Sequence, residues 1–169
     1  MMTNSAPTVI YKPSWVANTF LVRAREDRIS DVDPLKLQKL MYCLHGWNLA
    51  VRGHPAVGER FEAWPHGPVL SSIYHQFKSY GGFRIHGLAE EIDPTTGEKA
   101  TLIVAKSDEN FYEVFDRVWD RYKKFSGLKL SEMTHQPNTP WSYARKNGLQ
   151  YISDQMIRNH FIELSHVAA

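Results

Sequence analysis

The most regular hydrophobic pattern in the chain follows Asp33, where apolar side chains recur at steps of three and four residues. Asp33 and Pro34 stand before this run as an N-cap and a first-turn proline, and Gly53 stands after it as a left-handed stop. Val32 and Leu37 have the spacing of a hydrophobic staple. The pattern therefore predicts a long helix between Pro34 and Gly53, whose apolar face consists of Leu37, Leu40, Met41, Leu44, Trp47 and Val51.

A short aromatic corner comes next. Residues 61–64 (FEAW) predict either an extended segment or a single helical turn, and residues 65–68 (PHGP) cannot continue a helix, because the prolines lack a donor and restrict their neighbours. A second helix is predicted from Val69 to Tyr80, with Gly81 and Gly82 as its terminator. The plainest interpretation of Trp64 is a large aromatic side chain that packs this corner.

The rest of the chain predicts further helices and one small β element. Between residues 83 and 106 the helical pattern lapses, and Asp93–Gly97 is a turn-forming cluster followed by the apolar run Leu102–Val104, which predicts a β-hairpin or two short strands. Such a hairpin would have a free edge that can receive a partner strand. The other predicted helices follow caps at Ser14 (to about Asp27), Ser107, Ser126, Thr139–Pro140 (to Gly148) and Ser153, the last with a staple of Ile152 and Ile157.

Composition agrees with one ordinary domain. The chain has 169 residues, of which 43% are hydrophobic and 22% charged, and this length can bury a sizeable core. Residues 1–13 predict a loose arm, and residues 14–169 a single compact, mainly α domain with a small β-hairpin or short sheet. A single cysteine excludes an internal disulfide, and no long apolar run predicts a membrane span, so we expect a cytoplasmic protein.

The charge pattern gives little support to nucleic-acid binding. The formal net charge is only +2, which implies no strong field for a polyanion. Arg23, Arg25 and Arg28 would share one side of the first helix, but Glu26 and Asp27 dilute them. A solvated helix face is the simpler interpretation, and a nucleic-acid-binding regulator is kept as an alternative.

Catalytic and metal-binding patterns are weak. Cys43 with His45, His54 and His66 is the nearest approach to a cluster, but residues two apart on a helix point to different faces. The sequence contains no zinc-ligand set, P-loop, nucleophile elbow or dinucleotide fingerprint. We therefore predict no enzyme activity, metal or cofactor, and keep a small hydrolase that uses Cys43 or the histidines as a second, weaker alternative.

Two separated pieces of the sequence resemble the Panacea antitoxin domain, a SocA-like family that includes phage-associated GepA-type proteins. The resemblance covers most of residues 14–162 and is weakest from Phe83 to Lys106. The first piece is Leu35–Leu40 with Tyr42, His45–Trp47, Gly53, Phe61–Trp64, Gly67–Val69 and Tyr74, and the second is Leu130–Ser131, Thr134–His135 and Pro140–Trp141.

The resemblance implies an antitoxin of a type II system, which binds a cognate toxin protein and blocks it. Members of the family accompany many unrelated toxins, so the domain does not name the toxin, and some members are linked to delivery of the toxin to a protease. Because aromatic anchors carry much of the binding energy in protein interfaces, we take the aromatic corner and the second motif piece as the toxin-binding surface. The candidate residues are Trp64, Pro65, His66, Tyr74, His135 and Trp141.

Overall fold

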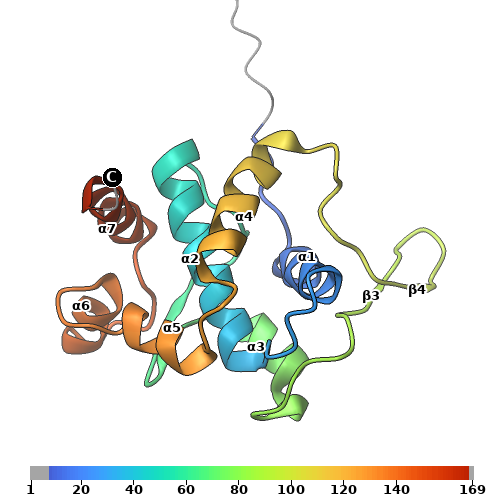
Figure 1. Cartoon of the computed structure of the whole chain (residues 1–169), viewed down its shortest axis with the longest axis horizontal. Coiled ribbons are helices and arrows are strands. Elements are labelled where there is room, and N and C mark those ends of the chain that lie inside the picture. The colour runs from blue at the N-terminus through green and yellow to red at the C-terminus, as the bar shows by residue number, and fades with distance from the viewer. Residues whose placement is uncertain (1–7, 168–169) are drawn as a thin grey trace, which may run out of the picture.

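The computed structural model describes residues 8–167, and residues 1–7 and 168–169 lie outside the described part. Its central element is α2 (Pro34–Arg52), which contacts α1, α3, α4, α5 and α7. In Figure 1, α6 and α7 lie to the left of α2, whereas α1 and the β3–β4 hairpin lie to its right. Most of α2 is buried, as expected of a helix that is covered on all sides.

The local signals around α2 explain where it begins and ends. The carboxylate of Asp33 accepts from the backbone N–H of Lys36 at 2.8 Å, and Pro34 is the first helical residue. At the other end Gly53 has φ +79°, and its N–H donates to the carbonyl of Leu49. These observations confirm the predicted bounds of the long helix.

Residues 8–167 contain six α-helices besides α2, so the predicted mainly α class is confirmed. The helix α1 packs its aromatic face against α4, where the rings of Phe20 and Phe115 are 4.7 Å apart. The helix α7 lies close to α2, with Phe161 facing Trp47 at 5.2 Å. The bounds are α1 Pro13–Glu26, α3 Ser71–Phe77, α4 Glu109–Tyr122, α5 Gly127–Thr134, α6 Pro140–Lys146 and α7 Asp154–Val167, with a single 3-10 turn at Lys78–Tyr80.

Within residues 8–167 the β structure consists of two antiparallel pairs. The strands β1 (Glu62–Trp64) and β2 (Gly67–Val69) form the corner, so of the two conformations predicted for residues 61–64 the extended one is adopted. The strands β3 (Glu91–Ile92) and β4 (Lys99–Ala100) form the hairpin expected around the Asp93–Gly97 turn.

The prediction of a strand at Leu102–Val104 is wrong. The amide side chain of Asn18 donates to the carbonyls of Ala89 and Leu102 and accepts from the N–H of Ala89. These backbone groups therefore bind a side chain of α1 instead of a neighbouring strand. The N–H of Val104 instead donates to the hydroxyl of Thr19 at 3.0 Å. Side chains of α1 therefore hold this segment in an irregular, extended path.

Three predicted helix starts are also wrong by one or two residues. The helix α1 begins at Pro13, and the hydroxyl of Ser14, the predicted cap, donates to the carboxylate of Glu91 instead. Asp108 rather than Ser107 caps α4, since its carboxylate accepts from the N–H of Phe111. Val69 belongs to β2, and α3 begins only at Ser71.

The caps at Ser126 and Thr139 are confirmed. The Ser126 hydroxyl accepts from the N–H of Lys129. Thr139 and Ser142 form a capping box, in which the hydroxyl of each accepts from the backbone N–H of the other.

The N-terminal arm predicted for residues 1–13 lies partly outside the described residues. From Tyr11 onward the chain is attached to the core, because Tyr11 pairs with the segment at Ala56–Gly58 and its ring packs edge-on against Phe111 at 5.4 Å. No helix in the described part of the chain combines the length and the apolar character needed to cross a membrane.

Candidate functional site

The structure brings the six predicted site residues onto one continuous surface, which we call the aromatic corner. The ring of Trp64, at the end of β1, lies 4.7 Å from that of Tyr74 in an edge-to-face arrangement. Pro65 and His66 form the exposed turn between β1 and β2. The aromatic corner comprises Trp64, Pro65, His66, Tyr74, His135 and Trp141.

The second motif piece reaches the corner through α5 and α6. The indole N–H of Trp141 donates to the carbonyl of Trp64 at 2.6 Å. The hydroxyl of Ser131 donates to the carbonyl of His66 at 2.6 Å and lies 3.3 Å from Nδ1 of His135. The proximity of the two motif pieces, about seventy residues apart, is thereby established.

The other side of the hairpin is held by buried polar residues of α2. The amide of Gln38 makes two hydrogen bonds with the backbone of Leu70, one to its carbonyl at 3.0 Å and one from its N–H at 2.9 Å. The ammonium of Lys39 donates to the carbonyl of Pro68 at 2.8 Å. These contacts explain why polar side chains stand on a buried helix face, since a buried polar group is stable only when it is paired.

Lys39 is an unusual cation in this position. Its side chain is fully buried, and burial lowers its pKa to about 7. A Cβ atom at Gly67 would approach Cε and Nζ of Lys39 to 3.0 Å, and Gly67 has φ +115°. The turn therefore needs glycine at this position, both for its backbone conformation and to leave room for the lysine.

The outer edge of β1 is also occupied. The N–H of Ala63 donates to the carbonyl of Gln150 at 2.9 Å, and the N–H of Ile152 donates to the carbonyl of Phe61 at 2.9 Å. The guanidinium of Arg145 donates to the carbonyl of Ala63 at 3.2 Å. With its backbone bound from α2, α5, α6 and the segment before α7, the corner presents its side chains on a fixed frame.

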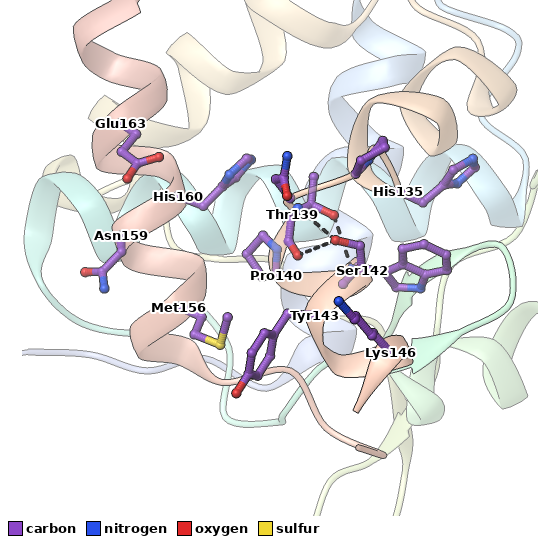
Figure 2. A pocket seen from close by; sticks show the side chains of 13 residues that line it. His135, Thr139, Pro140, Ser142, Tyr143, Lys146, Met156, Asn159, His160 and Glu163 are labelled. Carbon is purple, nitrogen blue, oxygen red and sulfur yellow. Dashed lines mark hydrogen bonds between the residues drawn. The ribbon is translucent and has the colours of Figure 1, made fainter. Parts of the chain in front are cut away.

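A hollow of about 810 Å³ borders the corner between α6 and α7. His135 and Trp141 belong to both the corner and the lining of the hollow, and their rings are 5.4 Å apart. Met156, Asn159, His160 and Glu163 of α7 line this hollow together with Tyr143 and Lys146 of α6 (Figure 2). The hollow extends the candidate surface beyond the residues that the sequence pointed to.

Within the described residues, Cys43 and the histidines near it in the sequence each have their own surroundings. Cys43 is buried, and burial raises the pKa of its thiol to about 12, so the nucleophilic thiolate is scarce at neutral pH. His45 is buried 2.8 Å from the carboxylate of Asp154, and His54 lies against Asn48. Among residues 8–167 no three His, Cys, Asp or Glu side chains are grouped so as to hold a metal ion.

Sequence reasoning missed the residues that hold the corner in place, namely Gln38, Lys39, Ser131 and Arg145. Three of them, Gln38, Lys39 and Ser131, stand in the two motif pieces, but their bonds join segments that are far apart in the chain. The signal that was available is a polar side chain on a helix face that is otherwise apolar. Such a residue requires a buried partner, although the sequence does not identify it.

Comparison with known proteins agrees with this architecture. The model of the family described as "Antitoxin SocA-like, Panacea domain" matches residues 37–142. The chain is 31% identical over 153 residues to Antitoxin SocA of Caulobacter vibrioides (strain NA1000 / CB15N), an alignment that covers 86% of this chain and 80% of that protein. No solved structure matches the chain.

Proposed function

Because the chain belongs to the SocA-like Panacea antitoxin family, we propose that it is the antitoxin of a type II toxin–antitoxin system and neutralises a cognate toxin by direct binding. The family model spans both sides of the aromatic corner, and the relative that covers most of the chain is named as an antitoxin. We further propose that it acts without catalysis and in the cytoplasm. Its single cysteine is free and buried, so the fold does not depend on a compartment that oxidises thiols.

The toxin-binding surface in this proposal is the aromatic corner. The observation that carries it is the edge-to-face pair of half-buried Trp64 and exposed Tyr74, on a backbone that side chains hold from several directions. Large aromatic side chains bury much apolar area with few rotatable bonds. A fixed frame also reduces the ordering cost of binding, because the hairpin does not have to be immobilised when the toxin arrives.

The exposed turn and the hollow beside the corner fit a protein partner. His66 and Pro65 are exposed at the turn, and the neighbouring hollow of about 810 Å³ is open, with both polar and apolar walls. Interfaces with folded proteins commonly combine an aromatic centre with a polar rim. Steric occlusion of the toxin at this surface is therefore the mechanism that we propose.

The test is co-expression with the product of the gene beside this one, scored by growth and by pull-down on a tagged antitoxin. We expect the neighbour to be toxic alone, harmless with this protein, and recovered in a stoichiometric complex. The variants Trp64→Ala and Tyr74→Ala should each weaken the complex by about 2 kcal/mol, or roughly thirtyfold in Kd. Phe83→Ala is the matched control, since Phe83 is an aromatic residue 81% exposed outside the corner.

Each outcome distinguishes one part of the proposal. Full neutralisation by folded Trp64→Ala and Tyr74→Ala proteins would place the toxin elsewhere on the surface. Rescue of growth without any complex would argue against direct binding. The steady-state amount of toxin separates two routes, because occlusion leaves it unchanged, whereas delivery to a protease lowers it.

A further inference from the structure

A second hollow, of about 300 Å³, lies where α1 ends and is lined by three solvent-exposed arginine residues. Arg25 and Arg28 come from the end of α1 and the turn after it, and Arg84 comes from the segment that follows α3 and its 3-10 turn. The hydroxyl-bearing residue Ser30 and aliphatic side chains complete the lining. No residue of the aromatic corner belongs to this hollow, so it is a separate feature of the molecule.

The lining of this hollow is basic and contains no acidic side chain. No carboxylate lines it, and within residues 8–167 the guanidinium groups of Arg28 and Arg84 make no hydrogen bond or ion pair. In the sequence, the carboxylates close to Arg25 and Arg28 have other contacts: Glu26 pairs with Arg23 at 3.7 Å, Asp27 accepts from the indole N–H of Trp119 at 2.7 Å, and Asp31 pairs with Lys36 at 2.7 Å. Three exposed cations that line one hollow repel one another only weakly in water, and a bound anion would remove this repulsion.

The backbone at Arg28 gives an independent indication. Arg28 has φ +56°, and the N–H of the next residue, Ile29, donates to the carbonyl of Ala24 at 2.9 Å, which closes α1 in the manner of a Schellman cap. Glycine is the usual residue at such a position, because the left-handed conformation crowds the Cβ atom of any other residue. An arginine in this strained conformation, with its side chain lining the hollow, points to a role in binding.

The helix end alone does not account for the cluster. The negative end of α1 favours Arg25 and Arg28, but it makes no demand on Arg84, which arrives from another part of the chain. Hydrogen bonds also join the two segments that line the hollow, residues 21–32 and residues 84–86. Arg25 donates to the carbonyl of His86 at 2.6 Å, and the N–H of Ile85 donates to the carbonyl of Val32 at 2.9 Å.

We propose that this hollow binds the phosphate groups of a small phosphorylated molecule of the nucleotide class. Guanidinium groups match the geometry of phosphate oxygens with two parallel hydrogen bonds. The aliphatic floor offers a surface for the uncharged part of such a molecule, and the volume is at the lower end of the range of small-molecule sites. A net charge of only +2 favours one local anion site over a surface that follows a nucleic-acid strand.

The experiment is calorimetric titration of the full-length protein with inorganic pyrophosphate, ATP and a short single-stranded oligonucleotide in low-salt buffer. We expect pyrophosphate and ATP to bind at one site and to weaken as salt is added. Arg28→Gly should lower this affinity at least about tenfold, because a charge-assisted contact is lost, while the relief of backbone strain keeps or raises stability. Arg84→Ala should weaken binding to a similar extent, whereas Arg117→Ala, an exposed arginine on α4, should not.

Several results would overturn the proposal. One is the absence of binding by pyrophosphate and ATP to the wild-type protein, and another is equal weakening by Arg117→Ala, which indicates a general charge effect. Tighter binding of the oligonucleotide than of ATP, with the same dependence on Arg28, would replace the small ligand with nucleic acid. We expect the Arg28→Gly protein still to neutralise the toxin. A negative result in the ligand titrations therefore leaves the antitoxin proposal untouched.

Discussion

The indole N–H of Trp141 donates to the backbone carbonyl of Trp64 at 2.6 Å, which joins α6 to the hairpin of the aromatic corner. The bond links residues 77 positions apart. Both tryptophans are only half-buried, so each has a structural contact on one side and surface available to a partner on the other. Packing and recognition therefore use the same side chains, and a test of function at Trp141 must also measure stability.

Trp141→Phe is expected to lower the free energy of unfolding by about 1–3 kcal/mol, because it leaves the carbonyl of Trp64 without its donor. The measurement is urea unfolding followed by circular dichroism. Tyr143→Phe is the matched control on the same helix, since Tyr143 is 49% exposed and its hydroxyl has no partner among the described residues. Equal stability of the two variants would show that solvent replaces the indole donor at no cost.

Gly46→Ala is expected to separate α7 from α2. A Cβ atom at Gly46 would lie only 2.2 Å from the ring of Phe161, so either this ring or the helix that carries it must move. Overpacking of this kind costs about 1–3 kcal/mol, and the better helix propensity of alanine offsets at most about 1 kcal/mol of it. Thermal unfolding should show a lower Tm, whereas Gly82→Ala, which meets no atom within 4 Å, should not change it much. An unchanged Tm for Gly46→Ala would mean that α7 adjusts without cost.

The sequence predicted best those features that depend on a few adjacent residues. The caps at Asp33 and Thr139 were found because each is followed directly by a proline at the first helical position. Ser14 misled because its hydroxyl bonds to Glu91, a residue 77 positions away, instead of the local backbone. Local patterns therefore identify a helix more reliably than the particular side chain that caps it.

The candidate site was predictable in part for the same reason. The resemblance placed both motif pieces in one family, and the structure places them on one surface. The pairing of β1 with β2 was missed, since strands of three residues are too short to show an alternating pattern. The bonds of Gln38 and Lys39 were missed because they depend on how α2 packs against the β1–β2 hairpin and Leu70, some thirty residues away in the chain.

Cys43 is expected to react slowly with thiol reagents in the folded protein. It is buried, and the raised pKa of about 12 leaves little thiolate at neutral pH. Titration with a chromogenic disulfide at pH 8 should detect almost no free thiol before unfolding and one thiol per chain in denaturant. Rapid modification of the native protein would contradict this and would revive the cysteine hydrolase alternative, which a fully functional Cys43→Ser variant would remove.

The lowered pKa of Lys39 makes stability depend on pH. An ordinary lysine in the unfolded chain has a pKa near 10.4, whereas burial lowers that of Lys39 to about 7 in the folded protein. Between these two values the unfolded chain binds more protons at this site than the native chain. The free energy of unfolding should therefore rise with pH above about 7, by up to about 1.4 kcal/mol per pH unit.

The measurement is urea unfolding of the wild type and of Lys39→Met at several values from pH 6 to pH 9. The difference between the two proteins isolates Lys39, because the other titrating groups, including the buried Cys43, are common to both and largely cancel. The lost hydrogen bond to the carbonyl of Pro68 lowers the stability of the variant by an amount that varies little with pH. We expect the difference to grow in favour of the wild type above pH 7 and to be nearly constant below it. A difference that stays flat up to pH 9 would show that Lys39 keeps its proton when buried, and that the hairpin backbone stabilises the full charge.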